Sequence, residues 1–243
     1  YLLEIGTEEL PYKFVNTGLV QLKSAFEQLL KDNHINYTGV KAFSTPRRLT
    51  LILEGFEEKQ PDTVKVVKGP ILNIAYDENG NLSKAGQGFA RKNGVDESAL
   101  YKEDNYIWAK VEQKGKSIKD ILQNNIENLV LKMQGPYFMR WADLDVKFQR
   151  PIRWVVSLLN DEELKIKIAD VESSRFSRGH RFKSDKVEIK NPDSYEQTLF
   201  ENNVVVDFER RKSIIVESAK KEAAKVGADV YMEDGLLEEV TNI

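Results

Sequence analysis

Two amphipathic stretches constrain the fold of this chain most. Between Asn16 and Asp32, large apolar side chains recur at three- and four-residue steps, the period of one face of an α-helix. The members of this stripe are Leu19, Leu22, Phe26, Leu29 and Leu30. A second stripe runs from Ser117 to Met133. Because such a stripe is stable in water only when another element covers it, both predicted helices need a sheet or further helices packed against them.

Short apolar runs bounded by turn residues predict the strands. They span residues 2–8, 48–55, 106–111, 152–159, 164–168 and 186–189. Further helices are predicted over 83–92, 192–201 and 207–226, with Asn16 as N-cap of the first helix, Asp207 as N-cap of the last and Gly227 as its stop. Lys68-Gly69-Pro70 is expected to separate the segments on either side of it.

Helices and strands come in clusters without a regular βαβ alternation, which predicts an α+β fold of mixed, mainly antiparallel sheets with packed helices. We expect three regions: an N-terminal α+β region (1–135), a β-rich middle rich in basic and aromatic residues (136–191) and a helical C-terminal region (192–243). The chain opens without Met and closes on a half-apolar run, so we expect it to be a fragment of a longer protein.

Composition excludes several kinds of chemistry. The absence of cysteine removes disulfides, thiol nucleophiles and thiolate metal sites, and two histidines are too few for a histidine metal cluster. The Gly86-Gln87-Gly88 stretch lacks the third glycine of a phosphate loop and lies in a predicted helix, which favours a small-residue packing face. We expect the adjacent carboxylates of Glu8 and Glu9 to lie on a solvated surface. We therefore predict no catalytic residue and no metal ligand, in a soluble, cytoplasmic chain without a signal peptide or membrane span.

One stretch departs from the chain's formal net charge of −3. Residues 136–183 hold six of the 11 arginines, and ten basic residues face seven acidic ones there. Aromatic residues interleave with these arginines, a mixture found on RNA-binding surfaces because a guanidinium can both grip a phosphate and stack on a base. The candidate RNA-binding residues are Arg140, Trp141, Arg150, Arg153, Arg175, Arg178, His180 and Arg181, with a smaller basic site at Arg47 and Arg48.

A structural role for the same residues stays open. Arginines beside tryptophans in β-rich regions also pack as cation–π pairs or cross-strand neighbours. Arg150-Pro151 and Arg178-Gly179 are consistent with turns, and Arg47-Arg48 with a solvated strand end.

Several separated motifs, in this order, resemble the N-terminal part of the bacterial glycyl-tRNA synthetase beta subunit. They are Leu3-Glu4-Ile5-Gly6-Thr7-Glu8-Glu9-Leu10-Pro11, Thr45-Pro46-Arg47-Arg48-Leu49, Gly88-Phe89-Ala90-Arg91, Met139-Arg140-Trp141, Arg150-Pro151-Ile152-Arg153-Trp154 and Arg178-Gly179-His180-Arg181-Phe182. The resemblance covers essentially the whole chain. Arg153 stands where the family often has a histidine, so chemistry that needs an imidazole there is not expected.

The resemblance implies a role in a glycine–tRNA ligase without a catalytic site in this fragment. In that family an alpha subunit holds the aminoacylation site with its ATP and magnesium, the beta subunit contributes tRNA binding, and the two form an alpha2beta2 heterotetramer. The front of the beta subunit is also similar to the body and tail regions of archaeal CCA-adding enzymes, which hold the tRNA acceptor arm and elbow. Two hypotheses follow: the chain binds tRNA(Gly) through its arginines, or it is an assembly scaffold without direct RNA contact.

Overall fold

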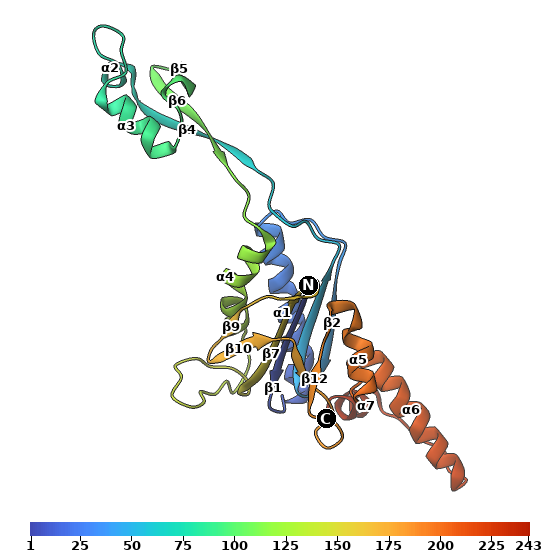
Figure 1. Ribbon diagram of the computed structural model, residues 1–243. Helices are drawn as coiled ribbons and strands as arrows, with labels where there is room; N and C mark the ends of the chain where they lie inside the picture. Colours follow the sequence, from blue (N-terminus) through green and yellow to red (C-terminus); the bar gives the residue numbers. More distant parts are fainter. The chain divides into compact units, whose positions relative to one another are not determined.

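The computed structural model describes residues 1–243, which form two compact units (Figure 1). Unit 1 comprises Tyr1–Glu58 and Ile118–Ile243, and unit 2 comprises Lys59–Ser117. Both units combine helices with mostly antiparallel sheets, so the α+β prediction is confirmed. Unit 1 draws on all three of the regions that we expect from the sequence.

A seven-stranded sheet is the centre of unit 1. Its strand order is β2 (Gly39–Thr45), β3 (Arg48–Glu54), β1 (Leu2–Thr7), β7 (Ile152–Leu159), β10 (Val171–Ser174) and β9 (Lys167–Ile168), with β8 (Glu162–Glu163) also paired to β7. Of these pairings, only β7 with β10 is parallel. Every residue of β1 is buried, because this strand lies between two neighbours and both faces of the sheet are covered.

Helices α1 (Tyr12–Asp32) and α4 (Ile118–Leu131) cover one face of this sheet. The buried side of α1 repeats every fourth residue, at Phe14, Gly18, Leu22, Phe26 and Leu30. The prediction of Asn16 as N-cap is wrong, because α1 begins a turn earlier, at Tyr12 with Pro11 in the cap position. Burial of Phe14 and Val15 in the core stabilises this additional turn, which a pattern read from Leu19 onward does not include.

The opposite face of the sheet is covered by a hairpin and a short helix. The hairpin consists of β11 (Phe176–Arg178) and β12 (Lys186–Glu188), and the helix is α5 (Tyr195–Glu201), preceded by the 3-10 turn η2 (Pro192–Ser194). They bury a second apolar cluster that includes Leu2, Trp154 and Tyr195. The helix predicted over 192–201 therefore divides into η2 and α5.

Two further helices complete unit 1, α6 (Phe208–Lys225) and α7 (Asp234–Thr241). Asp207 is the N-cap of α6, as predicted, because its carboxylate accepts from the Arg210 N–H at 2.7 Å. Gly227 follows the helix in the left-handed region at φ +69°, where glycine has no steric penalty, which confirms it as the stop.

Unit 2 is a three-stranded antiparallel sheet with helices on one side. The strand order is β4 (Thr63–Ile71), β6 (Tyr106–Gln113) and β5 (Leu100–Glu103), and the helices are α2 (Leu72–Ala75), α3 (Lys84–Asn93) and the 3-10 turn η1 (Glu97–Ala99). Lys68-Gly69-Pro70 does not end a segment but lies within β4, where the register with β6 shifts. None of the helices in either unit is both long and apolar enough to cross a membrane.

Candidate functional site

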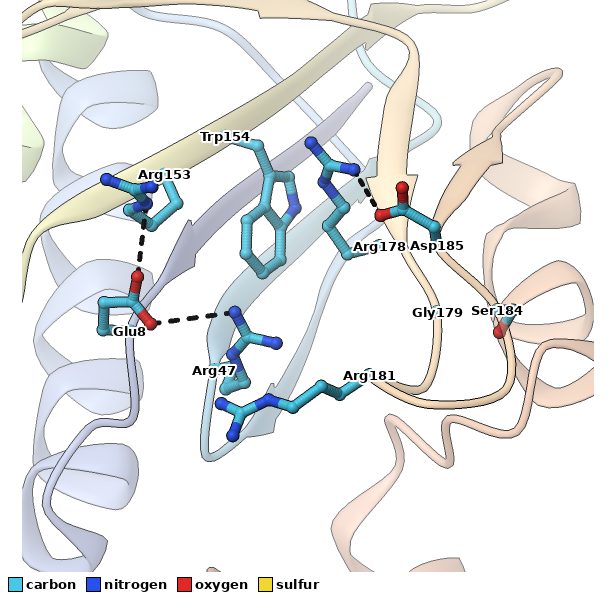
Figure 2. A pocket seen from close by; sticks show the side chains of 9 residues that line it. All are labelled: Glu8, Arg47, Arg153, Trp154, Arg178, Gly179, Arg181, Ser184 and Asp185. Atoms are coloured by element: carbon cyan, nitrogen blue, oxygen red, sulfur yellow. Dashed lines mark hydrogen bonds and ion pairs between the residues drawn. The ribbon is translucent and has the colours of Figure 1, made fainter.

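Four arginines of unit 1 surround an open pocket of about 370 Å³ (Figure 2). Arg47 lies between β2 and β3, Arg153 is in β7, Arg178 ends β11, and Arg181 is in the loop after it. We call this site the arginine pocket. Its lining residues are Glu8, Arg47, Arg153, Trp154, Arg178, Gly179, Arg181, Ser184 and Asp185.

Backbone hydrogen bonds hold these distant segments together. The Thr7 N–H donates to the Arg47 carbonyl at 2.8 Å, and the Glu8 N–H donates to the Pro151 carbonyl at 3.1 Å. The loop that carries Arg181 is closed by the Gly179 N–H, which donates to the Asp185 carbonyl at 2.9 Å. The end of β1, the β2–β3 turn, the start of β7 and the β11–β12 loop therefore meet at one point.

Trp154 forms the apolar part of the pocket. Its ring lies against Gly6, where a Cβ atom would be 1.9 Å from Trp154 Cε2, so only glycine leaves room for it. The guanidinium carbons of Arg47 and Arg48 are each 5.6 Å from the centre of this ring, within the range of cation–π attraction.

A buried carboxylate supports the pocket from beneath. Glu4 has no exposed surface and accepts hydrogen bonds from Trp154 Nε1, the Tyr195 hydroxyl and Ser177 Oγ. Arg48, which is 3% exposed, lies 3.4 Å from Glu4 and donates to the Arg178 carbonyl at 2.8 Å. Arg48 thus holds Trp154, Glu4 and the backbone of Arg178 in place and has no free surface for a ligand.

The pocket holds more positive than negative charge. Glu8 bridges two arginines, at 3.2 Å from Arg153 Nε and 3.8 Å from Arg47 Nη2. Arg178 pairs with the exposed Asp185 at 2.6 Å. Of the lining residues, four are cationic and only two are anionic. The neighbouring Glu9 pairs with Arg181 from outside the lining.

Arg47 is the least compensated of these cations. Burial and the like charge of Arg181 lower the pKa of the Arg47 guanidinium, which Glu8 and Glu9 offset only in part. Its Nε atom is buried without a hydrogen-bond partner. A guanidinium nevertheless stays protonated at neutral pH, so a bound anion would relieve both the lost hydration and the repulsion.

The remaining predicted contacts do not line the arginine pocket. Arg175 pairs with Glu163 at 3.2 Å, and Arg150 is half-buried and donates to the adjacent Gln149 carbonyl. Arg140 is exposed in the segment between α4 and β7, and Trp141 packs against the apolar core. The half-buried His180 lies in the loop after β11, where its Nδ1 accepts from the Phe182 N–H at 3.2 Å.

Sequence reasoning missed the acidic half of the site. Glu8 and Glu9 are surface carboxylates, but Glu8 pairs with Arg47 and Arg153, and Glu9 pairs with Arg181. Glu4 was detectable as the one charge in the apolar run Leu2-Leu3-Glu4-Ile5, although its partners come from three other strands and a helix. No motif in the sequence pointed to Asp185 as a residue of this site.

The fold and the pocket define an α+β protein with a basic, partly apolar site suited to an anionic ligand. The family model described as glycyl-tRNA synthetase beta subunit matches residues 1–243. A glycine–tRNA ligase beta subunit from Lactobacillus gasseri is 40% identical over the whole of this chain, and one from Desulfitobacterium hafniense is 38% identical. One from Clostridioides difficile is 37% identical over 99% of the chain. This chain belongs to the glycyl-tRNA synthetase beta subunit family and spans 36% of the length of these relatives.

Proposed function

We propose that this chain binds tRNA through the arginine pocket as the front part of a glycine–tRNA ligase beta subunit. It is not catalytic by itself. It positions tRNA(Gly) for ATP-dependent glycylation by an alpha subunit, which binds the ATP and magnesium, within a cytoplasmic alpha2beta2 heterotetramer.

The observation that carries this proposal is the convergence of Arg47, Arg153, Arg178 and Arg181 around Trp154. Guanidinium groups bind phosphate oxygens through two parallel hydrogen bonds, and contacts of this kind fix the position of a nucleic acid without reading its sequence. Arg153 and Arg181 keep 60% and 49% of their side chains exposed, so both are accessible to a phosphate backbone.

A second candidate function is assembly alone, and a specific observation favours it. Helix α6 has no buried residue, and Val226 and Tyr231 after it are 78% and 92% exposed. Docking of a partner chain would remove these apolar side chains from water. In this alternative the chain contacts the alpha subunit or other parts of beta, and RNA is held elsewhere.

Salt-dependent tRNA binding separates the two functions. In the parent chain, the logarithm of the tRNA association constant should fall linearly with the logarithm of the salt concentration. Arg153→Ala, Arg178→Ala and Arg181→Ala should each reduce this slope by about one unit per lost phosphate contact. Arg140→Ala is the matched control, because Arg140 is exposed but lies outside the pocket, and it should leave the slope unchanged. Circular dichroism confirms that each variant is folded.

Two outcomes would refute tRNA binding by the pocket. One is a parent chain that shows no salt-dependent binding even at low salt, which would favour the assembly role. The other is a slope that Arg140→Ala reduces as much as the pocket variants do.

A further inference from the structure

We propose that the open face of the unit 2 sheet binds unpaired nucleobases of single-stranded RNA by stacking. This site is separate from the arginine pocket and does not depend on it. The surface, which we call the aromatic sheet face, is formed by Val64, Val66, Lys68, Tyr101, Glu103, Tyr106, Trp108, Lys110 and Glu112.

Strand register places these side chains on one side of the sheet. Trp108 of β6 lies directly opposite Lys68 of β4 and Tyr101 of β5. Residues two apart in a strand share a face, so Tyr106 and Lys110 lie on the same side as Trp108.

The other side of the sheet faces the helices. Ile107 and Ala109 are fully buried there, and a Cβ atom on Gly69 would touch both Ile107 and Phe89 of α3. Within unit 2 the two helices therefore cover one face and leave the aromatic sheet face without a covering element.

The uncovered face carries partly exposed aliphatic and aromatic side chains. Val64 and Val66 are 60% and 49% exposed, and Tyr101, Tyr106 and Trp108 are only half-buried. Trp108 Nε1 donates to the Glu103 carbonyl at 3.0 Å, which fixes the indole while its ring atoms remain accessible. Rigid, partly open rings on a sheet are the platform on which single-stranded nucleic acids stack their bases.

Two lysines lie among these rings. Lys68 Nζ is 3.4 Å from the centre of the Tyr106 ring and 5.8 Å from that of Trp108, and Lys110 Nζ is 6.0 Å from that of Tyr101. Both side chains are long and flexible, so an incoming base can displace the ammonium group from the ring and leave it free to pair with the adjacent phosphate.

The charge of unit 2 favours an anionic ligand such as RNA over a neutral or cationic one. Its residues include ten lysines and arginines and eight acidic residues, whereas the whole chain has an acidic excess of three. Of the two acids on the aromatic sheet face, Glu112 lies opposite Val64 at the far end of β6 and Glu103 lies opposite Tyr106. The two lysines therefore provide the cations nearest the rings.

Fluorescence anisotropy with a labelled 12-residue oligoadenylate tests the proposal. The full chain carrying Arg178→Ala and Arg181→Ala serves as background, so that the arginine pocket contributes little. In this background Trp108→Thr and Lys68→Ala should each weaken binding, Trp108→Thr by about tenfold or more. Trp108→Tyr, which keeps an aromatic ring, should retain most of the affinity.

Lys102 and Tyr76 provide matched controls in the same unit. Lys102 Nζ lies 3.9 Å from the centre of the Tyr76 ring, but Lys102 is opposite Ile107 and so lies on the helix-covered side. Lys102→Ala and Tyr76→Thr should leave oligoadenylate binding unchanged. A 12-base-pair RNA duplex and an abasic 12-residue strand should bind at least about tenfold more weakly than oligoadenylate, because neither offers an unpaired base.

Three results would overturn the proposal. The first is no binding of oligoadenylate by the background chain, and the second is equal binding of the abasic strand, which would reduce the interaction to charge alone. The third is a loss of alpha-subunit binding by Trp108→Thr without any change in RNA affinity, which would make this face a protein interface.

Discussion

At the scale of single residues, Glu4 determines the shape of the arginine pocket without lining it. It accepts hydrogen bonds from side chains of β7, β11 and α5 and faces the buried Arg48 of β3. A buried charge is stable only when it is paired and hydrogen-bonded, so this network makes the four segments interdependent.

Glu4→Gln should lower the free energy of unfolding by about 3 kcal/mol, because it leaves Arg48 buried without a counter-charge. Urea denaturation measures this change. The control is Glu54→Gln, whose carboxylate pairs with exposed Lys41 at 2.6 Å and should cost less than about 1 kcal/mol. Equal losses in both variants would show that the Glu4 network contributes no more than a surface pair.

Tyr195 should make stability depend on alkaline pH. Burial, together with the charge of Glu4, raises the pKa of the Tyr195 hydroxyl well above 10. In the unfolded chain this hydroxyl ionises near pH 10, so its contribution is complete below about pH 10 and is lost as the pH rises above that value. The free energy of unfolding should fall by about 1.4 kcal/mol per pH unit there for this group.

Denaturation curves at pH 9 to 11 check this dependence. Tyr195→Phe should flatten the alkaline slope, although it also removes hydrogen bonds to Glu4 and Thr50 and so lowers stability at every pH. Tyr231→Phe, at a 92% exposed position, should leave the slope as it is. If Tyr195→Phe leaves the alkaline slope of the unfolding free energy unchanged, the slope does not come from ionisation of the Tyr195 hydroxyl.

At the scale of elements, α1 shows how a helix is stabilised when its repeating apolar residues are also the residues that the core buries. The four-residue repeat of α1 is visible in the sequence, but its first turn depends on the burial of Phe14 and Val15. Helix α6 is the opposite case, because none of its residues is buried and its capping side chain is local.

Asp207→Ala should therefore destabilise α6 more than any single exposed change within it, by about 1 kcal/mol. Amide hydrogen exchange of residues 208–212 should accelerate accordingly. Glu209→Ala, an acidic residue of the same first turn that is not the cap, should have an effect of only a few tenths of a kcal/mol. Similar exchange in the two variants would mean that the N-cap bond is not what holds this turn.

At the scale of the whole molecule, unit 2 is inserted into unit 1 at a single point. Lys59 and Ser117 form an antiparallel bridge, so the chain enters and leaves unit 2 at neighbouring positions. Contacts within unit 1 connect the segments before and after the insertion, as when the Ile118 N–H donates to the Glu58 carbonyl at 2.7 Å.

Replacing residues 60–116 by an Asn-Gly turn should leave unit 1 folded, because a two-residue turn can join an antiparallel pair of this kind. Thermal unfolding followed by circular dichroism should show one cooperative transition. The salt slope of tRNA binding through the arginine pocket should persist. When Arg178→Ala and Arg181→Ala are added to the shortened chain, oligoadenylate binding should disappear. A shortened chain without a cooperative transition would show that unit 1 needs unit 2 to fold.

Local features of this protein can be predicted from its amino-acid sequence. Hydrophobic period and capping residues predict α4, α6 and the apolar strand β1, since these signals depend on near neighbours along the chain. The sequence also showed that arginine and aromatic residues concentrate between residues 136 and 183.

Which of these residues act together depends on the folding of the whole chain. It moves Arg48 into the core beside Glu4, leaves Arg140 and Arg175 outside the arginine pocket and joins Arg47 to Arg178. Strand order in the sheet sets these relations, because β1 pairs with β3 and β7 through residues that are about 50 and 150 positions away. Such long-range pairings cannot be predicted from local sequence patterns, because they depend on how all the strands of the sheet come together.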